Sequence, residues 1–385
     1  MKIVHIVPTF YPATYWGGPI YSVYGLCNAL AGNPDVSLKV LTTDAASHNR
    51  NDAVEVMSFP MHYPNGYEVY FCQRLWGASF SPRMLMQLWP MIRYADVVHL
   101  TAVYSPPTIP TLLICRLLGK PVVWSPRGAL QRWKGSTKPF VKKIWEKICN
   151  ILIKQGKCVF HVTSESEASI SLERMPKVIA KLIPNGVDIP ENLPEKKWLP
   201  DEKLRLLFIG RLHPKKGIEN LLRAIKILDD VSVNLSIYGS GDDDYTVSLH
   251  RLVCELELED SVKFHGHVIG EEKMNAFMQS DLCVIPSYTE NFGMVIAEAL
   301  VHGIPVIASN GTPWKEIESQ GCGLWIKNTP ENIAKAINNI DRDLLSVMGS
   351  KGRTWIKNKF TWRFVASQIH ELYETIIAEE HNVIK

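Results

Sequence analysis

The sequence lacks the signatures of several common protein classes. No apolar run reaches the roughly 18 residues that a membrane-spanning helix requires. The beginning, MKIVHIVPTF, has one lysine and a short apolar stretch interrupted by His5 and Pro8, which is typical of a buried strand rather than a signal peptide. The eight cysteines are scattered, and none forms a C-x-x-C pair that would indicate a zinc site or a disulfide framework. We therefore expect a reduced, cytoplasmic protein.

Three nucleotide-binding and catalytic motifs are also absent. The first expected strand runs into Pro8-Thr-Phe-Tyr-Pro12 instead of G-x-G-x-x-G, the fingerprint of dinucleotide binding. The chain contains neither the G-x-x-x-x-G-K-[ST] phosphate loop nor the G-x-S-x-G nucleophile elbow. These absences argue against a nicotinamide-dependent oxidoreductase, which is the natural rival interpretation for a doubly wound α/β chain.

What is present indicates a globular protein of two domains. Of the 385 residues, 46% are hydrophobic and 21% are charged, the proportions of ordinary globular proteins. This length exceeds what one core comfortably serves, and two domains of roughly 150–200 residues are expected.

Charge is distributed unevenly between the two halves. Residues 1–190 contain 20 Lys and Arg against 11 Asp and Glu, whereas residues 191–385 contain 22 against 28. The densest basic segment, 132–157, has eight basic residues and one acid, Glu146. One interpretation is a helix that packs its apolar face on a core, and the other is an amphipathic segment that touches an anionic membrane surface. The apolar residues at helical spacing in this segment are Phe140, Val141, Ile144, Trp145, Ile148, Cys149, Leu152 and Ile153.

Strand and helix patterns alternate along the chain, which predicts parallel sheets with helices on both faces. The turn 183–188 and the prolines at 190, 194 and 200 indicate a linker, after which the alternation restarts. Helices are expected at 19–30, 110–118 and 294–301, and a last amphipathic helix at about 361–378. The strands are expected at 2–7, 37–42, 68–72, 97–100, 122–125, 158–163, 181–183, 205–209, 234–238, 262–265, 282–285, 305–308 and 323–326.

This pattern predicts two doubly wound, Rossmann-like domains that face a central cleft. We expect the first at 1–188 and the second at 189–360, with residues 361–385 packing back on the first domain. Ligands of such sheets bind outside the carboxyl ends of the strands, so the cleft is the expected site.

Two glycine-containing segments suit phosphate binding. Gly17 and Gly18 precede Pro19 and a helix pattern, where free amides and a positive dipole end would meet a phosphate. Gly210-Arg-Leu-His-Pro-Lys-Lys-Gly217 follows a buried strand, and its Arg211 and Lys216 are placed to neutralise a diphosphate.

Two further segments carry candidate polar groups. Glu290 lies in a loop and Glu298 about one turn into the helix that follows, where carboxylates and helix N-terminal amides would accept and donate bonds to sugar hydroxyls. His99 lies near the end of a strand, beside the predicted cleft, and a histidine there is either a catalyst or a satisfied core residue.

Six motifs occur in one order: Gly17-Gly18-Pro19, Pro184-Asn-Gly-Val-Asp188, Gly210-Arg-Leu with Lys216-Gly217, Tyr238-Gly-Ser-Gly241, Gly266-His-Val268, and Glu290 with Glu298. Together they resemble retaining glycosyltransferases of the GT-B fold, in the family 4 (group 1) type. The resemblance spans nearly the whole chain, and the motifs of the second domain are the more specific ones.

The resemblance implies a role for each matching residue. Arg211 and Lys216 would bind the diphosphate of a nucleotide-sugar, with Gly17 and Gly18 closing on it. Glu298 would hold the ribose, and Glu290 with the loop of Asn291, Phe292, Gly293 and Met294 would hold the sugar. Gly239, His267 and Val268 would belong to the donor site, the last two near the base. His99 falls on the first position of the family's His-x-His strand end, Thr101 stands at the second, and Arg127 and Tyr104 are candidates for acceptor contact.

The resemblance also implies chemistry without a metal, because cationic side chains and helix N-termini would stabilise the departing diphosphate. Asp242, Asp243 and Asp244 could be mistaken for a metal site, but an acidic run is usually solvated. We expect Glu290, His99, Arg211 and Lys216 to form the catalytic set, with no metal or cofactor.

The expected function is transfer of a hexose, with retention, from a UDP- or GDP-sugar to a lipid-linked glycan in cell-surface polysaccharide synthesis. Alternatives are a soluble small acceptor and a catalytically silent sugar-nucleotide-binding subunit. The expected partners are the donor, a sugar or lipid-linked glycan acceptor and an anionic membrane surface contacted through 132–157, with no nucleic acid. The expected location is the cytoplasm, with peripheral association at the inner face of the membrane as an alternative.

Overall fold

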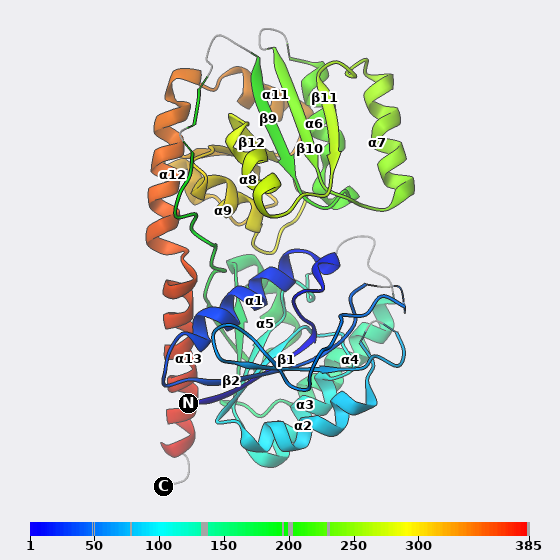
Figure 1. The fold of residues 1–385 in the computed structure, drawn as a ribbon, viewed down its shortest axis with the longest axis vertical. Helices are drawn as coiled ribbons and strands as arrows, with labels where there is room; N and C mark the ends of the chain where they lie inside the picture. Colours follow the sequence, from blue (N-terminus) through cyan, green and yellow to red (C-terminus); the bar gives the residue numbers. More distant parts are fainter. Residues whose placement is uncertain are drawn as a thin grey trace. The chain divides into compact units, whose positions relative to one another are not determined.

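A computed structural model describes residues 1–47, 49, 51–77, 79–131, 138–194, 196–198, 203–228 and 232–382, with side chains to residue 378. The chain forms two compact units. Unit 1 contains residues 1–186 and the C-terminal segment from Trp362, and unit 2 contains Val187–Thr361. Each unit is a parallel α/β layered structure, so the predicted fold class is confirmed (Figure 1).

Unit 1 is built on a sheet with the strand order β3-β4-β2-β1-β5-β6-β7-β8. All neighbours pair in parallel except β3 and β4, which pair antiparallel. The two-residue β3 was not predicted, because so short a strand leaves no alternating pattern. The strands are β1 (Lys2–Thr9), β2 (Ser37–Thr43), β3 (Met61–His62), β4 (Glu68–Cys72), β5 (Val97–Thr101), β6 (Val122–Ser125), β7 (Cys158–Val162) and β8 (Ile179–Leu182).

Helices cover both faces of this sheet. One face packs against α1 (Gly18–Ala31) and α13 (Trp362–Asn382), which lie side by side (Figure 1). The indole of Trp362 fits against Gly25 of α1, where an added Cβ would lie 2.2 Å from its Cε2 atom. The other face packs against four helices: α2 (Pro82–Tyr94), α3 (Thr108–Leu118), α4 (Pro139–Leu152) and α5 (Glu165–Arg174).

Unit 2 repeats the plan with six parallel strands in the order β11-β10-β9-β12-β13-β14. One face carries α6 (Ile218–Lys226), α7 (Asp243–Glu255) and α11 (Pro330–Asn338). The other carries α8 (Gly270–Met278), α9 (Met294–Val301), α10 (Glu316–Ser319) and α12 (Leu345–Lys359). The strands are β9 (Leu204–Ile209), β10 (Val233–Tyr238), β11 (Val262–Gly266), β12 (Leu282–Ile285), β13 (Val306–Ser309) and β14 (Gly323–Ile326).

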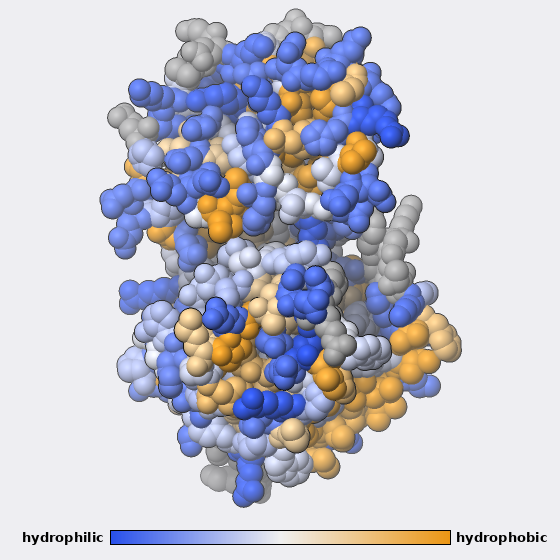
Figure 2. All heavy atoms as spheres, turned by 45° about the vertical axis from the view of Figure 1, so that its right-hand side comes forward, coloured by the Kyte–Doolittle hydropathy of each residue, from blue (hydrophilic) through white to orange (hydrophobic). Residues whose placement is uncertain are grey.

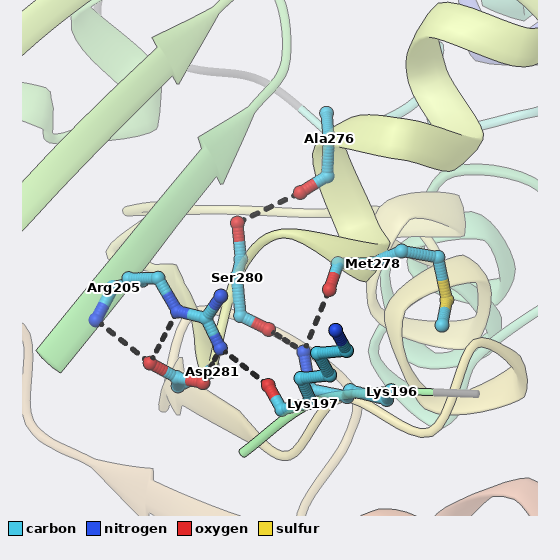
Figure 3. Close-up of polar contacts among 7 residues, drawn as sticks. All are labelled: Lys196, Lys197, Arg205, Ala276, Met278, Ser280 and Asp281. Carbon is cyan, nitrogen blue, oxygen red and sulfur yellow. Dashed lines mark hydrogen bonds and ion pairs between the residues drawn. The ribbon is translucent and has the colours of Figure 1, made fainter. Parts of the chain in front are cut away.

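The segment that enters unit 2 is fastened at the amino ends of β9 and β12 (Figure 3). The guanidinium of Arg205 donates two hydrogen bonds to the Asp281 carboxylate, Nε to Oδ2 at 2.9 Å and Nη2 to Oδ1 at 2.6 Å, and the Arg205 amide donates a third to Oδ2 at 3.0 Å. Lys196 donates to the carbonyl oxygens of Met278 and Ser280. Burial lowers the pKa of Lys196 to about 8. Ligands are expected at the carboxyl ends of the strands. This polar cluster lies at the opposite end of the sheet.

The apolar residues of helix α4 are divided between the core and the surface. Its apolar residues cover two faces, and only the face with Trp145 and Cys149 packs inward. The other apolar residues are exposed, including Phe140 at 74% and Ile151 at 62% of their full surface. The helix therefore packs one face on the core, as the first interpretation has it, and leaves further apolar residues exposed, which keeps the second interpretation open. Residues 132–137 of the basic segment lie outside the described residues.

Across the part of the chain that the structure describes, every helix is too short or too polar to pass through a bilayer.

Candidate functional site

The strongest candidate site lies at the carboxyl ends of β9 and β12 in unit 2. Beyond β9 the chain turns through Arg211 into a single 3-10 turn, Pro214–Lys216, and then into α6. Gly217 has a φ of 64°, and an added Cβ would lie 2.2 Å from the carbonyl oxygen of Pro286. Only glycine allows this close approach, which brings the 210–217 loop against the 286–290 loop.

Lys216 and Glu290 meet at this junction. The Lys216 ammonium donates to Oε1 of Glu290, which also accepts a hydrogen bond of 2.7 Å from the Ser287 hydroxyl. The Glu290 amide is fixed by the Gly311 carbonyl at 2.8 Å, and the Tyr288 amide by the Lys215 carbonyl at 2.8 Å. Burial acts to raise the pKa of Glu290, but Lys216, the Ser287 hydroxyl and Lys215 outweigh it, and the pKa is lowered. Glu290 is therefore ionised at neutral pH.

A cluster of positive charge surrounds this pair. Burial and the neighbouring Lys216 lower the pKa of Lys215. The pKa of His213 is lowered by burial and by the charges of Lys215, Arg211 and Lys216. Its ring is therefore neutral, and Nδ1 accepts a hydrogen bond of 3.1 Å from the Lys215 amide. Mutual repulsion among cations is relieved by an anion, so this loop has the electrostatics of an oxyanion-binding site.

The loop after Glu290 leads into the N-terminus of α9. Gly293 has a φ of 82° and stands immediately before the helix. Phe292 is 5% exposed and packs in the core against Trp314, whose indole NH donates to the Phe292 carbonyl. The side chain of Phe292 thus positions the loop, and contact with a ligand is left to backbone groups. The amides of Met294 and Val295, the first two of α9, have no acceptor within the helix and suit binding to oxygen atoms.

Glu298 lies on α9 and is held by a residue that the sequence analysis missed. Lys273 of α8 donates to Oε1 of Glu298 at 2.6 Å. Oε2 of Glu298 is buried and has no hydrogen-bond partner among the described residues. One carboxylate oxygen is thus fixed and the other is available to accept from a ligand. A Lys in a stretch of charged residues gives no sequence signal, because its role depends on how α8 packs beside α9.

The ends of β10 and β11 form a third part of this edge. Gly239 has a φ of 143°, and an added Cβ would lie 1.8 Å from the carbonyl oxygen of Gly210. Its amide donates to Gly266 at 2.7 Å, which joins the two strand ends. His267 is exposed and Val268 is part-exposed in the loop that follows.

The aspartate run has an observed structural use. The Asp242 side chain caps α7 by accepting from the Asp244 amide at 3.2 Å, and Asp243 and Asp244 occupy the first turn, where acids favour the helix dipole. Among the residues described, no three His, Cys, Asp or Glu side chains gather in a way that could hold a metal ion.

The unit 1 candidates lie in several places. Gly17, with a φ of 75°, precedes α1, and exposed Gly18 begins that helix. The Tyr104 hydroxyl donates to Glu146 of α4. Arg127 follows β6 and donates to Asn185.

His99 is fully buried, in contrast to the expected position at a cleft. Its two ring nitrogens bond the Tyr373 hydroxyl of α13 and the Ser125 hydroxyl, the latter at 2.7 Å. The ring stacks on His5 at 4.3 Å, and Thr101 bonds Nε2 of His5 at 2.8 Å. Burial together with His5, His161 and Arg127 holds the pKa of His99 well below its usual value. This geometry favours the core-residue interpretation, because no ring nitrogen is left for a substrate.

Comparisons with known proteins agree with this architecture. The chain superposes on sucrose-phosphate synthase from Thermosynechococcus elongatus with a TM-score of 0.72 and 22% identity, over 98% of this chain and 99% of that one. It superposes on HepE of Anabaena, solved in complex with UDP-glucose, with a TM-score of 0.71 and 18% identity over 97% of this chain and all of that one. These structures show that the chain has the GT-B fold.

The sequence comparisons match the second unit to a family model. Residues 190–355 match the family model described as "Glycosyl transferases group 1". A protein of the cps region of Klebsiella pneumoniae is 26% identical over 73% of this chain and 79% of its own length. The chain spans about half the length of several other curated relatives that it matches. The chain thus has the GT-B fold, and its residues 190–355 match the group 1 glycosyltransferase family, as the sequence motifs predicted.

Proposed function

We propose that the chain transfers a hexose from a UDP- or GDP-sugar, with retention, to a lipid-linked glycan intermediate in cell-surface polysaccharide synthesis. The observation that carries the proposal is the cation cluster of Arg211, Lys215 and Lys216 against ionised Glu290. Support comes from the HepE structure with UDP-glucose and from the cps-region relative. Retention rests on the family resemblance alone.

In this proposal the donor binds along the carboxyl edge of the unit 2 sheet. The diphosphate lies against Arg211 and Lys216, Oε2 of Glu298 accepts from the ribose, and Glu290 with the α9 amides binds the sugar. The stretch around Gly266, His267 and Val268 lies near the base, and Gly239 belongs to the donor site. When the bond between the sugar and the diphosphate breaks, negative charge develops on the diphosphate, and the fixed cations stabilise it. We propose that these cations replace a metal.

The donor part is tested by thermal stabilisation with a panel of nucleoside diphosphates and nucleotide-sugars, with EDTA present. Ligand binding to the folded state raises the unfolding temperature as RT ln(1 + [L]/Kd). We expect one nucleotide family to stabilise the chain and the shift to vanish in Lys216→Ala. If nicotinamide or adenine nucleotides stabilise the chain instead, or if stabilisation by any nucleotide survives the substitution, the proposed donor site is wrong.

The membrane part rests on the outward face of α4. Lys143 and Lys147 are exposed on α4 beside its exposed apolar side chains, so the face combines apolar and cationic groups, as membrane-surface helices do. Figure 2 shows apolar side chains gathered along one flank of unit 1. The exposed apolar residues of α4 are Phe140, Val141, Ile144, Ile148 and Ile151, and neighbouring α3 adds Leu113 and Leu117.

Sedimentation with vesicles tests this surface. We expect binding to vesicles that contain phosphatidylglycerol, weaker binding to neutral phosphatidylcholine vesicles, and loss of binding in the double variant Phe140→Glu/Ile144→Glu. The matched control is Val247→Glu/Leu344→Glu, which changes exposed apolar residues of unit 2. Equal binding by both double variants would remove the membrane role and favour the alternative with a soluble acceptor.

A catalytically silent sugar-nucleotide-binding subunit is the alternative from another class. Slow hydrolysis of the nucleotide-sugar in the absence of acceptor, abolished by Arg211→Ala, would exclude it. Tight donor binding with neither hydrolysis nor transfer to any acceptor would favour it.

A further inference from the structure

Arg127 occupies an unusual position at the carboxyl end of β6 in unit 1. Its backbone has a φ of 53°, in the left-handed region that residues with a Cβ rarely adopt. Holding a non-glycine residue there is costly, and such strain clusters at binding and catalytic sites. The conformation directs the side chain inward, so that its polar head is enclosed while the residue as a whole is part-exposed.

The guanidinium of Arg127 is only partly satisfied. Nη1 donates to Oδ1 of Asn185, a residue that is 5% exposed. Nε and Nη2 are buried and have no hydrogen-bond partner among the described residues. These two nitrogens lie on one edge of the planar group and point their hydrogens in the same direction. That edge is the fork with which arginine binds two oxygens of a single phosphate or carboxylate.

Among the described residues, no carboxylate bonds this edge. The buried carboxylate of Glu167 attracts the guanidinium, but its oxygens accept from the Gly128 amide, the Thr163 amide and the Thr163 hydroxyl. His5 and His161 are neutral, because burial and the charge of Arg127 lower the pKa of each. Burial in turn lowers the pKa of Arg127. A buried cation of this kind is costly unless a partner of opposite charge binds to it.

We propose that Arg127, oriented by Asn185, is a subsite for a phosphate group of the acceptor. The proposal rests on the proposed function, and it narrows the acceptor to one that carries phosphate. The same chemistry would serve a soluble sugar phosphate and a lipid-linked phosphate. Phosphate binds side-on to the Nε and Nη2 edge while Asn185 keeps Nη1 in place.

Binding of inorganic phosphate tests the subsite directly. The full chain is saturated with UDP or GDP, whichever stabilises it, so that the diphosphate site is filled. Thermal unfolding is then followed with rising phosphate against sodium chloride of equal ionic strength. We expect phosphate to stabilise the wild-type chain. In Arg127→Lys, which keeps the charge and loses the fork, we expect binding about tenfold weaker or worse. In Arg127→Gln we expect no stabilisation.

The control is Lys181→Gln, which removes an exposed positive charge from the same unit. Equal phosphate stabilisation in Lys181→Gln and Arg127→Gln, or none in the wild-type chain, would overturn the subsite. If no nucleotide binds, the donor proposal fails by itself, and the phosphate series in Lys216→Ala still decides on Arg127. Glucose 6-phosphate and micellar undecaprenyl phosphate then distinguish the two sources, and preference for glucuronate over both would refute the phosphate assignment.

Discussion

The ammonium of Lys216 and the carboxylate of Glu290 form a hydrogen-bonded ion pair, although 74 positions separate them in the chain. The pair joins the loop after β9 to the loop after β12. It holds the lysine extended at the strand ends and neutralises the one carboxylate of this loop junction. A diphosphate arriving beside Arg211 would therefore meet a lysine that is already oriented.

Replacing Lys216 with alanine should reduce the transfer rate by a factor of about 100–1000, the scale of losing one preorganised electrostatic group. Arg211→Ala should have a similar effect. The measurement is kcat with saturating donor, and the control is Lys226→Ala, whose side chain on α6 is 43% exposed and pairs with Glu257. If both variants at the cluster keep the wild-type rate, the assigned phosphate site is wrong.

Replacing Lys273 with methionine should weaken nucleotide binding about tenfold and leave kcat nearly unchanged. Without Lys273, Oε1 of Glu298 loses its charge-assisted hydrogen bond, and the carboxylate is no longer oriented for the ribose contact that we propose. Calorimetric titration with the nucleoside diphosphate measures the loss. Lys273→Arg should restore most of the affinity. A drop in kcat at unchanged nucleotide affinity would show that Lys273 acts elsewhere.

Removing the Tyr373 hydroxyl by substitution with phenylalanine should lower the free energy of unfolding by about 1–3 kcal/mol. The change leaves a buried nitrogen of His99 without its partner. Urea unfolding measures the change, and Tyr94→Phe, which loses a bond to Ser37 at an exposed position, should cost much less. Lowered kcat with unchanged stability would return His99 to the catalytic set.

Stability should rise with pH between about 8 and 10.5 because of Lys196. Burial lowers its pKa from 10.5 to about 8 in the folded chain. Between these values the unfolded chain binds more protons at this residue, so raising the pH favours the folded state. Below pH 8 the lysine is protonated in both states, and the cost of burying its charge is fully present. In Lys196→Met, the gain of roughly 1–3 kcal/mol from pH 7.5 to 10 should disappear. Urea unfolding at both pH values measures it, and an identical rise in both proteins would assign it to other groups.

The sequence predicted the strands well, because buried parallel strands appear as continuous apolar runs. It also predicted that Lys216, Glu290 and Glu298 lie at one sheet edge, because the loops that follow parallel strands lie at the same end of the sheet. It could not show Lys273, whose contact with Glu298 depends on the packing of α8 beside α9.

The sequence was least informative about which side chains are buried and which are exposed. His99 was expected at a cleft, but in the folded chain Tyr373 of α13 and Ser125 of β6 form hydrogen bonds with its two ring nitrogens. On α4, periodicity alone could not show which of two apolar faces packs inward. These features are decided by contacts between segments that are far apart in the chain.

The place of α13 in unit 1 has a consequence for how the chain is made. Val365, Ile369 and Tyr373 belong to the core between α1 and the first sheet, yet the ribosome synthesises them only after all of unit 2. Unit 2 is continuous in the sequence and can complete its core during translation. Unit 1 must wait with part of one face of its sheet uncovered beside α1, so the half that is made first is the half that is finished last.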